Sequence, residues 1–234
     1  MREPLIVAVA QPRCRAYDVV ANARAHAEAI RAARARVVVF PEMSLTGYEF
    51  DAAPVDADDP RLAPVVAACA ETGSLALVGA PVPGDTGRPH IGVLAVDGGG
   101  ARVAYRKMWL GGAEPEHFAP GNAPAVVEVP GWRLGLAVCK DTGVPRHAAD
   151  TAALGIDAYV AGVLDSAVDW DVQGERARRV AAAHRVWVAT ASFAGSTGGG
   201  YPDAAGRSRI WAPDGRVVAE AGPEPGAVVR AILS

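Results

Sequence analysis

The chain has 234 residues, of which half are apolar and about a fifth are charged, and its formal net charge is −3. These values are typical of one globular domain that buries a core without metals or disulfides. They argue against a nucleic-acid-binding surface or a polybasic membrane patch, because no long run of like charges is present. The three cysteines, Cys14, Cys69 and Cys139, form no C-x-x-C pair, so we expect a reducing, cytoplasmic setting.

The N-terminal part of the chain alternates strand-like and helix-like segments. Residues 5–10 are expected to form a strand, and not a signal peptide, because a polar glutamine ends the short apolar run. Residues 17–36 contain no Gly or Pro and place alanines at helical spacing, which predicts a helix on the solvent side. Residues 37–40 form the next strand, and residues 58–72 form a helix that Gly73 ends.

The remainder of the chain continues the alternation and adds hairpins. The turns D-G-G-G and P-D-G-R each join two strand-like segments, as expected for β-hairpins. Loops are expected at residues 111–125 and, rich in glycine, at residues 194–206. Further strands are expected at residues 75–82, 91–96, 101–106, 126–129, 133–138, 158–164, 186–193, 207–212, 217–221 and 228–233, and further helices at residues 146–154 and 171–185. This order predicts a layered α/β fold in one domain, residues 1–234, with a mixed sheet or two sheets.

Three of the expected strands lead directly into residues suited to acyl transfer, namely Glu42, Lys107 and Cys139. A thiolate attacks a carbonyl or nitrile carbon, a carboxylate moves the proton, and an ammonium stabilises the oxyanion. Each residue also has a structural alternative. Glu42 could be a surface carboxylate, Lys107 could be a solvated base after a hairpin, and Cys139 could be a core residue. Spacing alone leaves open whether the three side chains converge.

The same three segments resemble the motifs of the nitrilase superfamily of carbon–nitrogen hydrolases, and the resemblance covers most of the chain. F-P-E-M-S-L-T-G-Y, residues 40–48, is similar to the family's glutamate motif, and Y-R-K-M-W-L, residues 105–110, to its lysine motif. G-L-A-V-C-K-D-T-G-V-P, residues 135–145, is similar to part of its cysteine motif. The resemblance implies a four-layer α-β-β-α sandwich and an amidase-like branch of the superfamily.

The resemblance also implies a role for individual residues. Cys139 would be the nucleophile, Glu42 the general base and acid, and Lys107 the oxyanion stabiliser, with the backbone N–H of Lys140 as a second donor. Glu114, four residues before F-A-P-G, would orient Lys107 or the substrate. Glu116 is the alternative to Glu114 for this role. Substrate-binding residues are expected among the neighbours of the motif residues, namely Tyr48, Trp109 and Lys140.

The sequence also departs from the family pattern. Many members have Arg and Glu further along after the cysteine, where this chain has Gly143 and Arg146, and Trp109 replaces a frequent histidine. True nitrilases usually carry Trp-Glu after the cysteine, so Lys140 and the aspartate after it argue against that branch. Two further positions match the family: Arg176 on a helix near the site region and Ser208 in a late hairpin.

The leading prediction is a hydrolase that cleaves a non-peptide C–N bond of a small linear amide or N-carbamoyl compound through an acyl-thioester. A nitrilase and a catalytically inactive binding module remain alternatives, as does a redox sensor at Cys139, although no resolving cysteine lies nearby in sequence. No cofactor and no metal are expected, because the histidines show no ligand spacing. The expected partners are a small-molecule substrate and further copies of the chain, in at least a homodimer with the helix near residues 171–185 at or near the interface.

Overall fold

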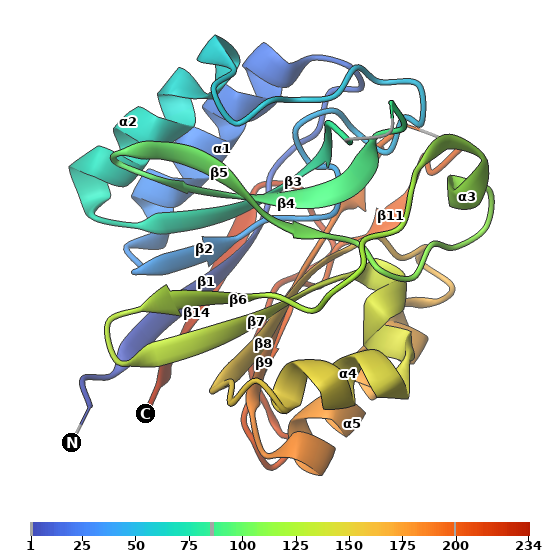
Figure 1. Cartoon of the computed structure of the whole chain (residues 1–234). Coiled ribbons are helices and arrows are strands. Elements are labelled where there is room, and N and C mark those ends of the chain that lie inside the picture. The colour runs from blue at the N-terminus through green and yellow to red at the C-terminus, as the bar shows by residue number, and fades with distance from the viewer. Residues whose placement is uncertain (1, 85–86, 199) are drawn as a thin grey trace.

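Two β-sheets face each other in the computed structural model, which describes residues 2–84, 87–198 and 200–234, and helices cover the outer face of each sheet (Figure 1). The first sheet has the strand order β14-β1-β2-β3-β4-β5, and the second has the order β13-β12-β9-β8-β7-β6. The predicted four-layer α-β-β-α sandwich is therefore confirmed. The strands of the first sheet are β1 (Leu5–Gln11), β2 (Val37–Val39), β3 (Leu75–Val82), β4 (His90–Asp97), β5 (Gly100–Arg106) and β14 (Ala227–Leu233).

Helices α1 (Val19–Ala33) and α2 (Ala63–Thr72) pack on the outer face of the first sheet (Figure 1). Helix α1 begins where the Asp18 side chain accepts a hydrogen bond from the backbone N–H of Ala21, which satisfies one of the free donors of the first turn. It is shorter than the helix predicted at residues 17–36 because Tyr17 and Arg34, with φ of 62° and 46°, leave helical backbone geometry.

The second sheet consists of the remaining long strands, with helices α4 (Pro145–Ala152) and α5 (Trp170–His184) on its outer face (Figure 1). The predicted glycine-rich loop at residues 194–206 carries two short paired strands, β10 (Ala194–Gly195) and β11 (Ala204–Ala205), although Gly199 lies outside the described residues. The strands of the second sheet are β6 (Val126–Val129), β7 (Trp132–Val138), β8 (Ala158–Val163), β9 (Trp187–Ser192), β12 (Arg209–Trp211) and β13 (Val217–Glu220).

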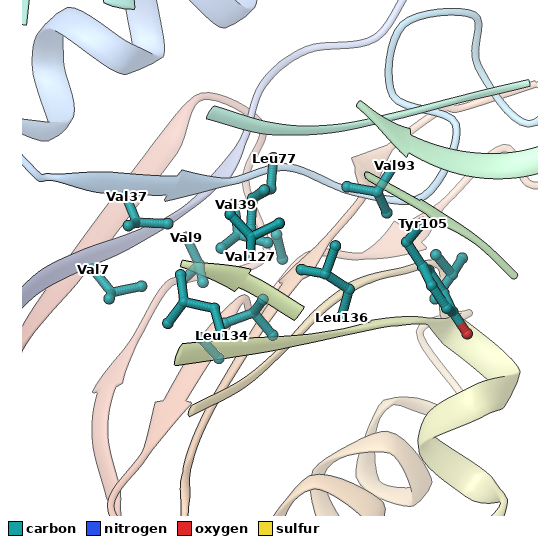
Figure 2. Close-up of a cluster of buried hydrophobic side chains, with 14 of the residues drawn as sticks. Val7, Val9, Val37, Val39, Leu77, Val93, Tyr105, Val127, Leu134 and Leu136 are labelled. Carbon is teal, nitrogen blue, oxygen red and sulfur yellow. The ribbon is translucent and has the colours of Figure 1, made fainter. Parts of the chain in front are cut away.

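Aliphatic side chains fill the space between the two sheets (Figure 2). Val37 and Val39 of β2 point into this layer, whereas Val38 between them packs under the outer helices. Leu134 and Leu136 face them from β7 of the other sheet. Because successive side chains point to opposite faces and both faces are covered, these strands are continuous apolar runs. Each fully buried Val or Leu contributes about 1.5–3 kcal/mol, so the strand ends are held firmly.

Among the residues that the structure describes, no helix is both long enough and apolar enough to cross a membrane.

Candidate active site

The turn that carries Glu42 passes between the two sheets just after β2. A Cβ added to Gly79 of β3 would lie 2.2 Å from the carbonyl oxygen of Pro41. A Cβ added to Gly162 of β8 would lie 2.6 Å from the carbonyl oxygen of Phe40. Both contacts are much shorter than real Cβ contacts, so only glycine at these two positions leaves room for the turn. The turn places the Glu42 side chain in the interior, with 1% of its surface exposed.

Helix α1 supports the same turn from the outer side. The ring nitrogen Nε2 of His26 lies 2.8 Å from Oγ of Ser44, and the Asn22 amide donates a hydrogen bond of 2.9 Å to the carbonyl oxygen of Leu45. Burial lowers the pKa of His26 to about 4 because it disfavours the charged imidazolium. The neutral ring therefore accepts from the Ser44 hydroxyl, and its other nitrogen donates to the carbonyl oxygen of Asn22.

Lys107 follows directly after β5 and lies between two buried carboxylates. Its Nζ donates hydrogen bonds of 2.7 Å to Oε1 of Glu42 and of 2.7 Å to Oε1 of Glu114. Burial acts to lower the pKa of Lys107, but the negative charge of Glu42 and its neighbours outweighs burial and raises the pKa. The side chain is therefore an ammonium, and it is 1% exposed.

Glu114 is held on both of its oxygens. Oε1 also accepts a hydrogen bond of 2.6 Å from the hydroxyl of Tyr48, and Oε2 accepts one of 2.7 Å from the backbone N–H of Gly111. Glu114 begins α3 (Glu114–His117), a short helix within the loop predicted at residues 111–125. Glu116 and His117 are exposed, and Glu114 is the glutamate of this helix that contacts Lys107.

Cys139 begins the 3₁₀ turn Cys139–Gly143 immediately after β7, with φ of 42°. This left-handed backbone is costly for a residue with a side chain and tends to occur at functional sites. The thiol donates a weak hydrogen bond of 3.5 Å to the carbonyl oxygen of Leu164. Burial and the charge of Glu42 raise the pKa of the Cys139 thiol, and the positive charge of Lys107 opposes them. The side chain of Cys139 is therefore a neutral thiol at rest.

Glu42 has one oxygen bound and one free. Oε1 accepts from Lys107, whereas Oε2 is buried and has no hydrogen-bond partner among the described residues. Burial raises the pKa of Glu42, and the positive charge of Lys107 opposes this rise. The Cys139 thiol also acts to lower the pKa of Glu42, and the charge of Glu42 in turn raises the pKa of the thiol. A buried carboxylate oxygen without a donor is a strong acceptor for a proton that arrives from a neighbouring group.

These groups open into a cavity of about 360 Å³. Tyr48 and Lys140, both predicted to bind substrate, lie on its wall together with the catalytic candidates. The motifs did not indicate Phe50, Leu164 and Tyr201 as members of the wall, because these residues come from separate segments of the chain. The lining residues are Glu42, Tyr48, Phe50, Lys107, Gly111, Gly112, Ala113, Glu114, Cys139, Lys140, Leu164 and Tyr201.

Trp109 is not among the described residues that line the cavity. Its ring stands edge-on to His147 with 5.5 Å between ring centroids, and its backbone N–H donates to Oδ1 of Asp141. The geometry therefore favours a packing role over the predicted contact with substrate. Lys140 makes no ion pair with Asp141 or Glu114 in the described structure. Its Nζ instead donates a hydrogen bond of 2.8 Å to the carbonyl oxygen of Leu110.

The remaining family positions surround the site without lining it. Arg176 on α5 packs against Gly143, where an added Cβ would lie 2.9 Å from Nε of the arginine. Arg146 is exposed and pairs with Asp150 on its own helix. Ser208 is buried and accepts a hydrogen bond of 3.0 Å from the backbone N–H of Ser192, so it ties neighbouring strands together.

Within residues 2–84, 87–198 and 200–234, no group of three or more His, Cys, Asp or Glu side chains is placed to hold a metal ion.

The family model described as "carbon-nitrogen hydrolase" matches residues 6–233, so the chain belongs to the carbon–nitrogen hydrolase family. It is similar over 233 residues, at 30% identity, to the Pseudomonas protegens protein named "hydrolase in pqqF 5′ region". That match covers 95% of this chain and 81% of the relative.

Solved structures of the nitrilase superfamily share the fold. A mutant of the amidase from Nesterenkonia AN1 has a TM-score of 0.87 at 25% identity and covers 98% of this chain and 90% of its own. A mutant of the same amidase in complex with butyramide has a TM-score of 0.88 at 25% identity, with the same coverage. A superfamily protein of Xanthomonas campestris has a TM-score of 0.88 at 20% identity and covers 99% of this chain and 91% of its own.

Proposed function

We propose that the chain is a cysteine-dependent amidohydrolase that cleaves the C–N bond of a small linear amide or N-carbamoyl compound through an acyl-thioester. One observation carries this proposal. Glu42 holds the Lys107 ammonium with Oε1 and keeps Oε2 without a hydrogen-bond partner, beside the Cys139 thiol at the wall of the cavity. A base with a free acceptor, a nucleophile and a cation then face one space, as acyl transfer requires.

The first half-reaction forms the thioester. Sulfur of Cys139 attacks the carbonyl carbon while the thiol proton moves to Oε2 of Glu42, and the carbonyl electrons move onto oxygen. The Lys107 ammonium and the backbone N–H of Lys140 stabilise this oxyanion. When the tetrahedral intermediate collapses, the C–N bond breaks, and the leaving nitrogen takes the proton from Glu42.

The second half-reaction consumes water. A water molecule attacks the thioester carbon and gives its proton to Glu42, and the oxyanion forms again beside Lys107. The C–S bond then breaks, and the proton returns to sulfur of Cys139, which restores the neutral thiol. Glu114 takes no proton in this scheme; it holds Lys107 through the 2.7 Å bond and is itself fixed by Tyr48.

The lining and the volume of the cavity favour a small substrate. Phe50, Leu164 and Tyr201 give it an apolar side, and the charged groups lie at the reacting end. A cavity of about 360 Å³ is at the small end of the range for ligand sites. The amidase of Nesterenkonia, whose fold this chain shares, has been solved in complex with butyramide, a small linear amide of this class.

The test is a substrate panel followed by intact-protein mass spectrometry. Small amides, N-carbamoyl amino acids and nitriles are assayed with ammonia detection, and the reaction with a slow substrate is then quenched and weighed. We expect ammonia from an amide or carbamoyl compound and an acyl adduct mapped to Cys139. The Cys139→Ala variant should be folded, inactive and free of adduct, and the matched control Cys69→Ala should behave as the unmodified protein.

Four outcomes would contradict the proposal. An adduct on Cys14 or Cys69, or full activity in Cys139→Ala, would remove the nucleophile from the scheme. Turnover of nitriles alone would favour a nitrilase, and tight binding of amides without any turnover would favour an inactive binding module.

A further inference from the structure

A buried carboxylate links the turn that carries Cys139 to the turn that carries Lys107. Asp141 is fully buried and is not among the described residues that line the cavity. Its Oδ2 accepts a hydrogen bond of 2.9 Å from the backbone N–H of Val138, the residue before the nucleophile. Its Oδ1 accepts one of 2.9 Å from the backbone N–H of Trp109, two residues after Lys107. One side chain therefore sets the spacing of two segments that come from different sheets.

A chain of three further buried residues holds this carboxylate in place. The hydroxyl of Tyr105 lies 2.8 Å from Oδ2 of Asp141 and 2.9 Å from Nε2 of His147, and Nδ1 of His147 lies 2.8 Å from the hydroxyl of Tyr159. The ring of Tyr105 lies at one end of the aliphatic layer between the sheets, with its hydroxyl directed out of that layer (Figure 2). The four side chains are at most 3% exposed.

The directions of these hydrogen bonds follow from the first of them. A carboxylate has no hydrogen to donate, so the Tyr105 hydroxyl donates to Asp141. The oxygen of Tyr105 is then free to accept from Nε2–H of His147, whose Nδ1 accepts from the hydroxyl of Tyr159. This order requires a neutral imidazole, which agrees with the pKa of His147 being lowered by burial. All three side-chain hydrogen bonds of the chain can form in this order, so the carboxylate has little freedom to turn.

We propose that Asp141, held by Tyr105, His147 and Tyr159, is a positioning residue that sets the placement of the Cys139 thiol relative to the Lys107 ammonium. The proposal rests on the proposed function for its effect on turnover, but not for its effect on the thiol itself. The backbone of Cys139 is left-handed, with φ of 42°, and the Asp141 carboxylate helps to hold it in that conformation. The strained turn persists only where surrounding bonds hold it, and the bond to the N–H of Val138 is adjacent to it.

Asp141→Asn separates positioning from simple support of the fold. The amide keeps the shape of the carboxylate but replaces one acceptor with a donor. Whichever way it turns, the N–H of Val138 or the N–H of Trp109 then faces another donor and loses its partner. Tyr105→Phe is a second variant that leaves Asp141 unchanged and removes only the hydroxyl that orients it. The matched control is Thr151→Val, which removes a buried hydroxyl bonded to the carbonyl oxygen of His147 on the same side of the molecule.

Three quantities are measured for each variant: kcat and KM on the best amide, the rate at which iodoacetamide alkylates Cys139, and the melting temperature. We expect Asp141→Asn to lower kcat at least tenfold with KM within about twofold, and to change the alkylation rate severalfold, with Tyr105→Phe intermediate. Thr151→Val should lose a similar number of degrees in melting temperature but keep kcat and the alkylation rate.

The readouts distinguish failure of this inference from failure of the proposed function. If no amide is turned over by the unmodified protein but Asp141→Asn changes the alkylation rate and Thr151→Val does not, the positioning role stands and the amidase activity fails. If amides are turned over and both Asp141→Asn and Tyr105→Phe keep kcat and the alkylation rate, the positioning role is overturned. It is also overturned if Thr151→Val loses kcat in the same proportion to its loss of melting temperature as Asp141→Asn.

Discussion

The charge balance of the site depends on Lys107, the buried cation between Glu42 and Glu114. A carboxylate without a partner is expensive in the interior, and removing one member of a buried ion pair typically costs about 3–5 kcal/mol. Lys107 supplies that partner to two carboxylates at once, and the Tyr48 hydroxyl supplies one further donor to Glu114. The same ammonium that stabilises the folded chain is available to an oxyanion in the cavity.

Lys107→Met is expected to lower both stability and activity. The free energy of unfolding should fall by about 3–5 kcal/mol because two buried carboxylates lose their cation. The value of kcat should fall by a factor of at least about a hundred because the oxyanion loses a donor. Urea denaturation and steady-state kinetics measure the two effects. Equal stability of the methionine variant and the unmodified protein would show that Lys107 does not offset the charge of the two buried carboxylates.

Lys140 is an exposed cation at the wall of the cavity, and we propose that it favours substrates that carry an acceptor group. The test pair is succinamate and butyramide, which differ by a carboxylate in place of a methyl group. We expect Lys140→Met to lower the ratio of kcat/KM for succinamate over butyramide about threefold to tenfold, as for a partly solvated ion pair. Lys140→Arg is the control that keeps the charge. An unchanged ratio in Lys140→Met would assign Lys140 only to its bond with Leu110.

At the scale of elements, the Glu42 turn owes its position to strands of both sheets. Gly79 of β3 and Gly162 of β8 approach the turn from opposite sides, so a small shift of either strand moves the Glu42 carboxylate. A misplacement of about 1 Å at a reacting group can cost about a hundredfold in rate. Two glycines in strand interiors are therefore part of the site although they do not line the cavity.

Gly162→Ala is expected to lower kcat at least about tenfold, because the added Cβ would press on the backbone of Phe40 and Glu42. The matched control is Gly135→Ala on the neighbouring strand β7. There the new Cβ would meet the side chains of Thr151 and Ile156 instead of the turn. Kinetics and denaturation of both variants decide the point. We expect Gly135→Ala to lose stability and keep kcat, and equal losses of kcat in the two variants would contradict the argument.

Helix α1 adds a pH dependence through His26. The pKa of His26 is lowered to about 4 in the folded chain, below the usual value of about 6.5 for the unfolded one. Its contribution to stability is therefore present above pH about 6.5 and is lost as pH falls through about 4. The loss amounts to about 3 kcal/mol, since each pKa unit is worth about 1.4 kcal/mol.

The variant His26→Gln tests this dependence by removing the titrating group. We expect it to be less stable at neutral pH but to show a shallower fall in the free energy of unfolding between pH about 6.5 and 4. Ser44→Ala is the control, because it removes the partner hydroxyl and keeps the histidine. The measurement is urea denaturation at several pH values. The assignment fails if His26→Gln and the unmodified protein show the same slope.

The catalytic candidates could be predicted from the sequence because each lies just after an expected strand, within a local motif that resembles one of the family's motifs. Glu42, Lys107 and Cys139 are of this kind, and the structure brings them to one cavity. Phe50 and Tyr201 could not be predicted, because their presence on the wall depends on how two separate loops fold over the site. Local pattern also missed the short helix α3 and the paired strands β10 and β11, whose hydrogen bonds are set by tertiary packing.

At the scale of the whole molecule, the two sheets each supply part of the site. Glu42 and Lys107 follow strands of the first sheet, and Cys139 follows β7 of the second. The site therefore exists only when the sheets are packed face to face through the aliphatic layer between them (Figure 2). Loosening that layer should lower activity through geometry before it unfolds the chain.

The surface near α5 is where we propose that two copies of the chain meet, in at least a homodimer. Val168, in the segment before α5, is 89% exposed, and Val172 on the helix is 49% exposed, so this end of the helix presents apolar surface to solvent. Exposed apolar groups that adjoin one another are typical of contact surfaces. Val172→Asp should therefore shift the protein toward monomer in light scattering at micromolar concentration. Val20→Asp makes the same change on α1, where Val20 is 41% exposed, and should leave the assembly intact. A monodisperse monomer of the unmodified protein, or dissociation by Val20→Asp alone, would contradict this arrangement.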